Sequence, residues 1–314
     1  MSAWVILALA ASAIGGEVTA IARAPGDAPA ATAPVAAAAA LPAERHSEQA
    51  GWWIVETANF RVCSRASSAE SARIARHCEA LRHSIRDLWL PGVVDSSWTP
   101  RCDVIAHSTE AGYLRAVGRG AAHTAGSALV EFSGTAVAVR RVDLKHAAPE
   151  ALESALAHEL THVVLADRFR DRPLPRWADE GMAVLADSLA KQRLHWRDLQ
   201  QGLRSRSTLR LAEIVSLADY PAPQRMGVFY GQSVSIVSYL LTCGQRGQFV
   251  EFVDAALSRG YDQALRDVYQ IDGLSELERR WLASVTSGPA RFVSRTPADF
   301  PVIESLRTST RTGT

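Results

Sequence analysis

Two histidines four positions apart, with a glutamate directly after the first, form the segment of this sequence that most clearly carries chemistry: His158-Glu159-Leu160-Thr161-His162. In an α-helix this spacing places both imidazoles on one face, one turn apart, where they can bind one metal ion. Glu159 is offset by one residue, so its carboxylate is expected beside the metal, in the position of a general base. The segment therefore predicts a helix that binds a metal and activates water.

A catalytic zinc ion needs three protein ligands and one open position. Glu180 follows His162 by 18 residues. Between them Arg172-Pro173 ends the first helix, so that a second helix, expected over Trp177–Ala190, can run back antiparallel to it. We predict Glu180 as the third ligand rather than the neighbouring Asp179, because the longer side chain reaches more easily across a helix pair.

Together these two segments resemble the gluzincin, or peptidase-MA-like, metallopeptidases. That family binds its metal through an H-E-x-x-H helix and the glutamate of a W-x-x-E-G segment, which here are His158 to His162 and Trp177 to Gly181. The resemblance implies a zincin-like fold, one Zn²⁺ per chain, and hydrolysis of peptide bonds with Glu159 as general base. It extends over roughly residues 52 to 285 and is weaker at its outer parts: Thr57–Val62, which resembles the opening strand of such domains in exported bacterial proteins, Tyr230–Ser233 and Leu274–Trp281.

Further site residues are implied by the family alone. Related gluzincins place a tyrosine or histidine on a later helix to stabilise the oxyanion, and the resemblance gives this role to Tyr230. A packed aromatic at a helix start is the alternative for Tyr230, and Arg225 is a weaker candidate in an expected loop.

The sequence departs from the family in two places. Val184 stands where thermolysin-type enzymes carry the aspartate that orients a histidine ligand, so another group has to do this. The G-x-M-E-N segment with which aminopeptidases of the clan hold the substrate's amino terminus is missing from the sequence, and this favours an endopeptidase.

Two other functions stay open for the same residues. One is a non-catalytic zincin-fold domain that binds a partner at the cell surface, and the other is hydrolysis of a non-peptide amide or ester. Two histidines and a glutamate suit zinc, although other divalent ions can occupy such a site. Six further histidines lack a second ligand set and are expected at the surface or at helix caps: His77, His83, His107, His123, His146 and His195.

The first half of the domain is expected to form a small sheet. Short β-branched and aromatic runs predict its strands, and Ser133-Gly134 predicts the turn of a hairpin. In that hairpin, Ala136–Arg140 is expected to line the cleft and to accept an extended peptide by strand addition. The predicted strands are Trp53–Val55, Phe60–Val62, Cys102–Ala106, Ala128–Phe132 and Thr135–Val142.

Helices are expected before and after this hairpin. Ser67 and Glu70 form a capping box at the start of one helix, and Pro91-Gly92 ends it. Pro149 starts the helix that carries the metal segment, and helical periodicity continues almost to Val285. The predicted fold class is therefore α+β and zincin-like: a mixed or antiparallel sheet over residues 51–147, then a mainly helical half over residues 148–286.

The N-terminus predicts export. An apolar run, Trp4–Ile14, precedes small-x-small cleavage sites ending at Ala22 and Ala24, so residues 1–24 are predicted as a signal peptide and the protein as periplasmic or extracellular. An uncleaved anchor over Ala3–Ala22 is the alternative and would tether the chain to the membrane, whereas no stable transmembrane span is expected after cleavage. Residues 25–50 are predicted as an Ala/Pro-rich linker and residues 287–314 as a mobile tail.

The composition narrows the partners. The 314-residue chain has a formal net charge of +1 and no long basic run, which argues against a nucleic-acid partner. A peptide or protein substrate is expected instead. In an exported protein the four cysteines, Cys63, Cys78, Cys102 and Cys243, can pair, and Cys63 with Cys78 is the preferred pair; four buried free thiols are the alternative.

Overall fold

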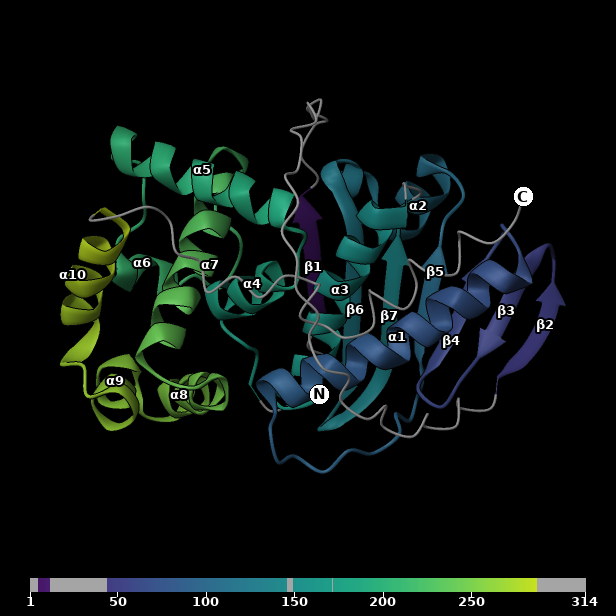
Figure 1. Ribbon diagram of the computed structural model, residues 1–314, viewed down its shortest axis with the longest axis horizontal. Coiled ribbons are helices and arrows are strands. Elements are labelled where there is room, and N and C mark those ends of the chain that lie inside the picture. The colour runs from purple at the N-terminus through teal and green to yellow at the C-terminus, as the bar shows by residue number, and fades with distance from the viewer. Residues whose placement is uncertain (1–4, 12–43, 146–148, 171, 287–314) are drawn as a thin grey trace, which may run out of the picture.

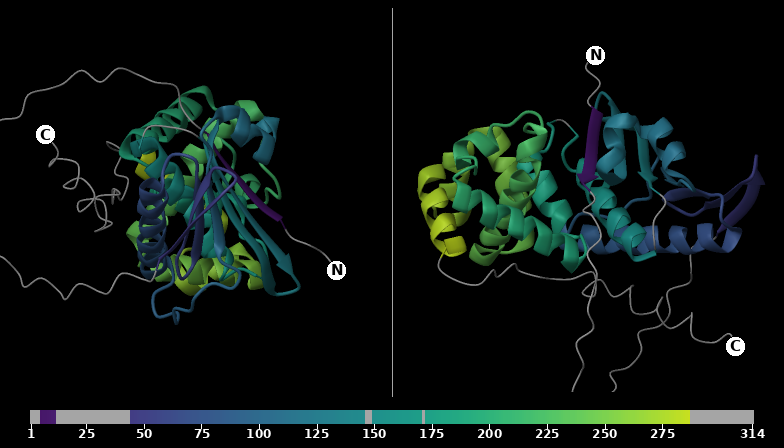
Figure 2. Two further views of the ribbon diagram at one scale, coloured as in Figure 1. Left: turned by 90° about the vertical axis from the view of Figure 1, so that its right-hand side faces the viewer. Right: turned by 90° about the horizontal axis from the view of Figure 1, so that it is seen from above.

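The computed structural model describes residues 5–11, 44–145, 149–170 and 172–286. They form a mixed α+β fold in which the sheet with its covering helices lies beside a purely helical half (Figure 1). The α+β class expected from the sequence is confirmed. The same two halves lie side by side when the molecule is seen from above (Figure 2, right).

The sheet has seven strands in the order β1-β6-β7-β5-β4-β3-β2. Its β4–β5 and β5–β7 pairs are parallel, and the other pairs are antiparallel. Parallel neighbours need a crossover, which α1 supplies between β4 and β5. The strands are β1 (Val5–Ala11), β2 (Arg45–Gln49), β3 (Trp52–Glu56), β4 (Phe60–Ser64), β5 (Cys102–Ala106), β6 (Thr124–Ser133) and β7 (Ala136–Leu144).

The predicted hairpin is confirmed as β6 and β7. Strand β7 lies between β6 and β5, but β5 pairs only with its last part, Arg141–Leu144, so among the described residues no strand pairs with Ala136–Arg140 on the side away from β6. Strand addition at Ala136–Arg140 stays a prediction. The predicted linker ends earlier than expected, because strand β2 lies within residues 25–50. The rest of that linker up to residue 43, the 287–314 tail and most of the predicted signal peptide lie outside the described residues.

Helix α1 (Ser68–Trp89) covers the sheet and also packs against α3. It begins at the predicted cap, because the hydroxyl of Ser67 accepts a hydrogen bond from the backbone N–H of Glu70 at 3.0 Å. The other half of the predicted capping box is wrong, because the Glu70 carboxylate accepts from Arg73 instead. Its buried stripe includes Ile74, Cys78 and Leu81. The helix α2 (Glu110–Val117) and the short 3-10 helix η1 (Arg119–His123) follow β5.

Helix α3 (Pro149–Ala166) carries the metal segment and packs on β6 and β7. The single helix expected over Trp177–Ala190 is two helices: α4 (Arg176–Leu185) ends before Asp187, and Ser188 caps α5 (Leu189–Ser205) by accepting from the N–H of Lys191. A serine that can bond the backbone of the next turn starts a new helix at this point.

The remaining helices enclose α7 (Met226–Cys243). The segment Pro223–Cys243 is long and apolar enough to cross a membrane, but 67% of its most apolar 18-residue stretch is buried within the protein, as in a core helix. Its apolar side chains pack against α4 and α5. Around it lie α6 (Leu211–Val215), the 3-10 helix η2 (Pro223–Arg225), α8 (Arg246–Arg259), α9 (Tyr261–Tyr269) and α10 (Gly273–Thr286).

The preferred cysteine pair is wrong. All four cysteines are free thiols: Cys78 and Cys102 are buried, Cys63 is half-buried and Cys243 is exposed. Cys78 faces the core from α1, whereas Cys63 alternates with buried neighbours along β4 and points partly to solvent. The buried thiols behave as small apolar groups in the core, as in the alternative prediction for two of the four.

Candidate metal centre

The three predicted ligands meet between α3 and α4. One ligand atom from each of His158, His162 and Glu180 lies within 4.8 Å of the others. The Oε2 atom of Glu180 is 3.5 Å from Nε2 of His158 and 3.9 Å from Nε2 of His162. All three side chains are buried, and these three atoms have no hydrogen-bond partner. Buried polar atoms of this kind need a further group to bind them, and two imidazole nitrogens with a carboxylate oxygen fit zinc.

An aspartate holds the other ring nitrogen of each histidine. Nδ1 of His158 lies 3.1 Å from Oδ2 of Asp187, and Nδ1 of His162 lies 2.7 Å from Oδ1 of Asp179. A carboxylate on Nδ1 fixes the tautomer and the ring orientation, and so directs Nε2 toward a metal. Asp187 thus lies where it can orient His158, the role that Val184 cannot fill, and Asp179 contacts His162 at Nδ1 rather than at the nitrogen that faces Glu180.

Glu180 is held by a residue outside every recognised motif. The hydroxyl of Tyr220, in the segment after α6, donates to Oε1 of Glu180. This leaves Oε2 of Glu180 as the atom that faces the histidines. The Tyr220 ring is itself packed, with its centroid 6.1 Å from that of Phe229 and 5.0 Å from the guanidinium carbon of Arg176.

The predicted general base lies against a glycine of the sheet. Glu159 is fully buried, and neither of its carboxylate oxygens has a hydrogen-bond partner. A Cβ atom at Gly126 of β6 would lie 2.7 Å from Cγ and 2.9 Å from Oε1 of Glu159, which is too close. The Tyr113 hydroxyl donates to the carbonyl oxygen of Gly126 at 2.8 Å and fixes this part of the strand. The position of the carboxylate therefore requires glycine at 126.

Burial and neighbouring charges set the proton affinities of these groups. Burial raises the pKa of Glu159 from 4.5 to about 7, against the opposing effect of the two imidazoles. Burial lowers the pKa of His158, but the Asp187 carboxylate outweighs this and the pKa rises to about 10. Burial also opposes ionisation of Glu180, yet the His162 and His158 imidazoles lower its pKa overall. A carboxyl group that titrates near neutral pH can both accept and release a proton.

Tyr230 lies on α7 and is buried close to this group. The Glu180 and Glu159 carboxylates are among the causes that raise the pKa of its hydroxyl, after burial itself. Its ring packs on His195 of α5, with centroids 5.2 Å apart. The expectation that His195 is a surface or capping residue is wrong, because its side chain is buried and neither ring nitrogen has a hydrogen-bond partner. Arg225 is exposed in η2, as the loop expectation implied.

The other histidines divide between surface and core. His77 and His107 are buried, contrary to the prediction, whereas His83 and His123 are exposed. His107 is held in place by Asp143, 2.7 Å away. His146 lies outside the described residues.

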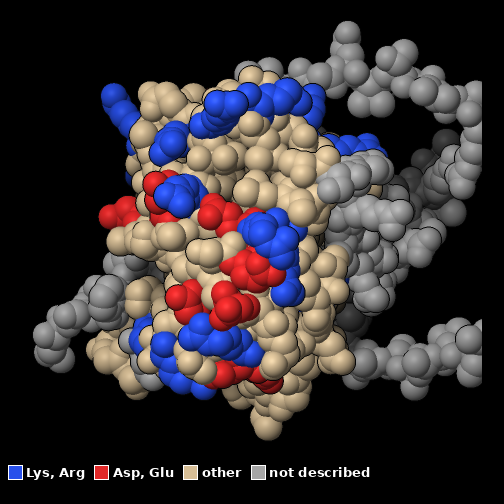
Figure 3. All heavy atoms as spheres, turned by 90° about the vertical axis from the view of Figure 1, so that its left-hand side faces the viewer, with Lys and Arg blue, Asp and Glu red and all other residues tan. Residues whose placement is uncertain are grey.

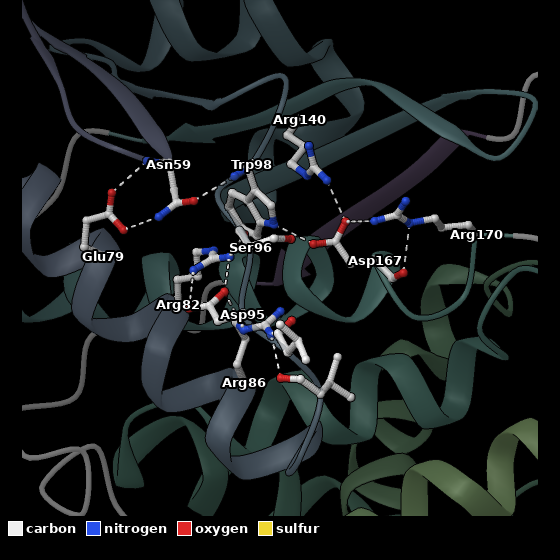
Figure 4. Close-up of polar contacts among 12 residues, drawn as sticks. Asn59, Glu79, Arg82, Arg86, Asp95, Ser96, Trp98, Arg140, Asp167 and Arg170 are labelled. Carbon is white, nitrogen blue, oxygen red and sulfur yellow. Dashed lines mark hydrogen bonds and ion pairs between the residues drawn. The ribbon is translucent and has the colours of Figure 1, made fainter.

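A second polar network fixes the C-terminal end of α3 (Figure 4). Asp167, directly after the helix, accepts from Arg140 of β7 at 2.6 Å and from the indole N–H of Trp98. Asp95 and Trp98 both lie in the loop between α1 and β5. Arg82 and Arg86 of α1 bind Asp95 at 2.7 and 3.1 Å. The largely buried Arg140–Asp167 pair anchors the end of α3 to the sheet, and the ion pairs of the exposed Asp95 tie the loop that carries Trp98 to α1.

No protein-family model matches the chain, and no curated protein is significantly similar to it. The function therefore has to be argued from the geometry of the site.

Proposed function

We propose that the protein is a zinc-dependent metallopeptidase of the gluzincin type with a zincin-like fold, and that it acts as an endopeptidase on peptides or proteins. The observation that supports this most strongly is the convergence of three buried, unpartnered ligand atoms from His158, His162 and Glu180 beside the unpartnered carboxylate of Glu159. A structural zinc site has no need of such a carboxylate. A hydrolase requires one as its general base.

The residues divide the chemistry among them. His158, His162 and Glu180 would hold the zinc, which when bound supplies a Lewis acid that polarises the scissile carbonyl and acidifies water. Glu159 accepts the proton of the attacking water and passes it to the leaving amine. Tyr230 would donate to the developing oxyanion from the α7 side, in the role that the family resemblance gives it.

A second function is favoured by one observation: the side chains of His158, Glu159, His162 and Glu180 are at most 1% exposed. Closed metal sites are typical of structural zinc, where the metal stabilises a domain that binds a partner. The two functions differ in what Glu159 does, because only the peptidase needs its carboxylate.

The test measures metal content and cleavage of a peptide library by the same preparations. The parent chain should bind one zinc and cleave peptides. Glu159→Gln should keep the zinc and lose turnover by two or more orders of magnitude, the usual contribution of a general base. Glu153→Gln, the same change on the same helix, is the matched control, because Glu153 binds Arg73 at 2.9 Å and lies outside the site.

The outcomes separate the proposals. Zinc without cleavage of any peptide favours the non-catalytic domain, and cleavage of only non-peptide amides or esters favours a different hydrolase. A chain that binds no zinc contradicts both the peptidase and the structural-zinc function.

A further inference from the structure

The outer face of α5 carries a row of arginines. Arg193, Arg197 and Arg204 are spaced four and seven residues apart, which at 100° per residue places them within about 40° of one another around the helix. The row is about 16 Å long, since eleven residues separate its ends and each adds about 1.5 Å. All three side chains are exposed, and among the described residues none of them takes part in an ion pair within 4.0 Å.

The basic surface continues beyond the helix. Arg206, which caps α5, Arg210 before α6 and Arg225 in η2 are also exposed and without an ion-pair partner among the described residues. We call these six residues, Arg193 to Arg225, the α5 basic face. Lys and Arg side chains gather along the upper edge of the view in Figure 3, where α5 lies in Figure 1, whereas acidic and basic groups are interspersed below it.

The acidic residue of α5, Asp198, interacts with Arg197 but forms no ion pair within 4.0 Å with any of the three arginines. Asp198 is directed toward α7, where a Cβ at Gly227 would lie 2.9 Å from its Oδ2. The buried face of the helix, with Gln192, His195 and Leu199, packs inward. Helix α5 is therefore two-sided: one face packs inward, and the other presents a row of arginines with Asp198 as the single acidic residue of the helix beside it.

We propose that the α5 basic face binds an anionic phospholipid surface. Arg197 and Arg204 border an open hollow together with Trp196 and Asp198, and the row of three guanidinium groups extends beyond it over about 16 Å. A row of this length is longer than one small anion and matches a plane of anionic headgroups. Arginine binds phosphate oxygens in a bidentate manner. The partly buried Trp196 flanks the row, and tryptophan is enriched at membrane–water interfaces. Export, as predicted from the N-terminus, would bring the chain to such a surface.

This proposal does not depend on the peptidase function. Its test is cosedimentation of the full chain with phosphatidylglycerol–phosphatidylcholine vesicles and with vesicles of phosphatidylcholine alone. The measured quantity is the difference between the two, because the apolar N-terminal segment would contribute equally to both. Binding should be restricted to the anionic vesicles and should fall as salt is added.

Replacing Arg193, Arg197 and Arg204 together by Gln should weaken binding roughly a hundredfold, since each arginine near an anionic surface contributes about fivefold, or about 1 kcal/mol. Replacing the same three by Lys should retain most of the binding. The matched control removes the same charge from the sheet half, as Arg45, Arg115 and Arg119 to Gln; these residues are likewise exposed.

Equal weakening by the control triple would show a general charge effect and overturn the proposal. So would equal binding to both kinds of vesicle, or binding to neither. Tighter binding of a duplex DNA or of polyglutamate than of the vesicles would assign the α5 basic face to a different partner.

Discussion

Asp187→Asn tests whether a second carboxylate organises the metal centre. Asp187 is fully buried and holds Nδ1 of His158 at 3.1 Å, while Lys191 binds it at 2.9 Å and Ser154 at 3.4 Å. Asparagine has the same shape but lacks the charge that fixes the imidazole and raises its basicity. Loss of such a partner typically weakens metal binding by roughly 10- to 100-fold, or about 1.4 to 2.7 kcal/mol.

The assay is competitive titration of the metal-free chain with zinc against a chelating dye, on samples whose circular dichroism confirms folding. Two variants serve as references. Asp179→Asn acts on the other histidine and should weaken binding to a similar extent, whereas Asp219→Asn changes an exposed residue and should have no effect. If Asp187→Asn binds zinc as tightly as the parent chain, the carboxylate does not orient His158 for a metal, and the reasoning that assigns it the role missing at Val184 is wrong.

Three further changes test two close contacts around the site and one buried histidine of α1. Gly126→Ala should reduce peptide turnover while zinc content stays unchanged, because the added Cβ at 2.7 Å from Cγ of Glu159 displaces the base but no ligand; loss of zinc would show that the strand supports the ligands as well. Gly181→Ala should lower the free energy of unfolding by about 1 to 3 kcal/mol in urea titrations and weaken zinc binding, because its Cβ would lie 2.4 Å from Cγ2 of Val237. His77 is buried, and burial lowers its pKa from 6.5 to about 4. As the pH falls, the imidazole is protonated in the unfolded state before it is protonated in the folded state, so the free energy of unfolding decreases between these two pKa values. His77→Leu should reduce the loss of stability between neutral and mildly acidic pH by up to about 3 kcal/mol, and an unchanged pH dependence would contradict a neutral buried imidazole.

The parts of the site that were predictable are those that local geometry fixes. His158 and His162 share a helix face because they are one turn apart, so the helix alone brings them together. Glu180 could be predicted to lie near the histidines because prolines break the chain after α3 and allow the next helix, α4, to run back beside it. The structure brings Glu180 to Nε2 of both histidines and Asp179 to Nδ1 of His162, because adjacent residues point about 100° apart on a helix. Side-chain length was the reason to prefer Glu180, and its role as third ligand stays a prediction.

The parts that were missed depend on contacts distant in the sequence. Gly126 and Glu159 meet only because α3 packs on β6, and Tyr220 reaches Glu180 across 40 residues of chain. No periodicity or spacing marks such residues. The expected Trp177–Ala190 helix failed for a local reason, since Ser188 was not recognised as the cap of a new helix, and that missed break is what exposes Asp187 to His158.

Helix α7 carries none of the proposed metal ligands, yet it packs against both α4, which carries Glu180, and α5. Gly181 of α4 is in close contact with Ser233 and Val237 of α7, and Gly231 of α7 is in equally close contact with His195 and Leu199 of α5. Neither the contact of α4 with α7 nor that of α5 with α7 leaves a gap, so a tilt of α7 would move Glu180 on α4 and the helix α5 together. The site thus depends on the packing of three helices, α4, α5 and α7. A substitution at a buried position of α7 can therefore change the site, as can one in the segment His158 to His162.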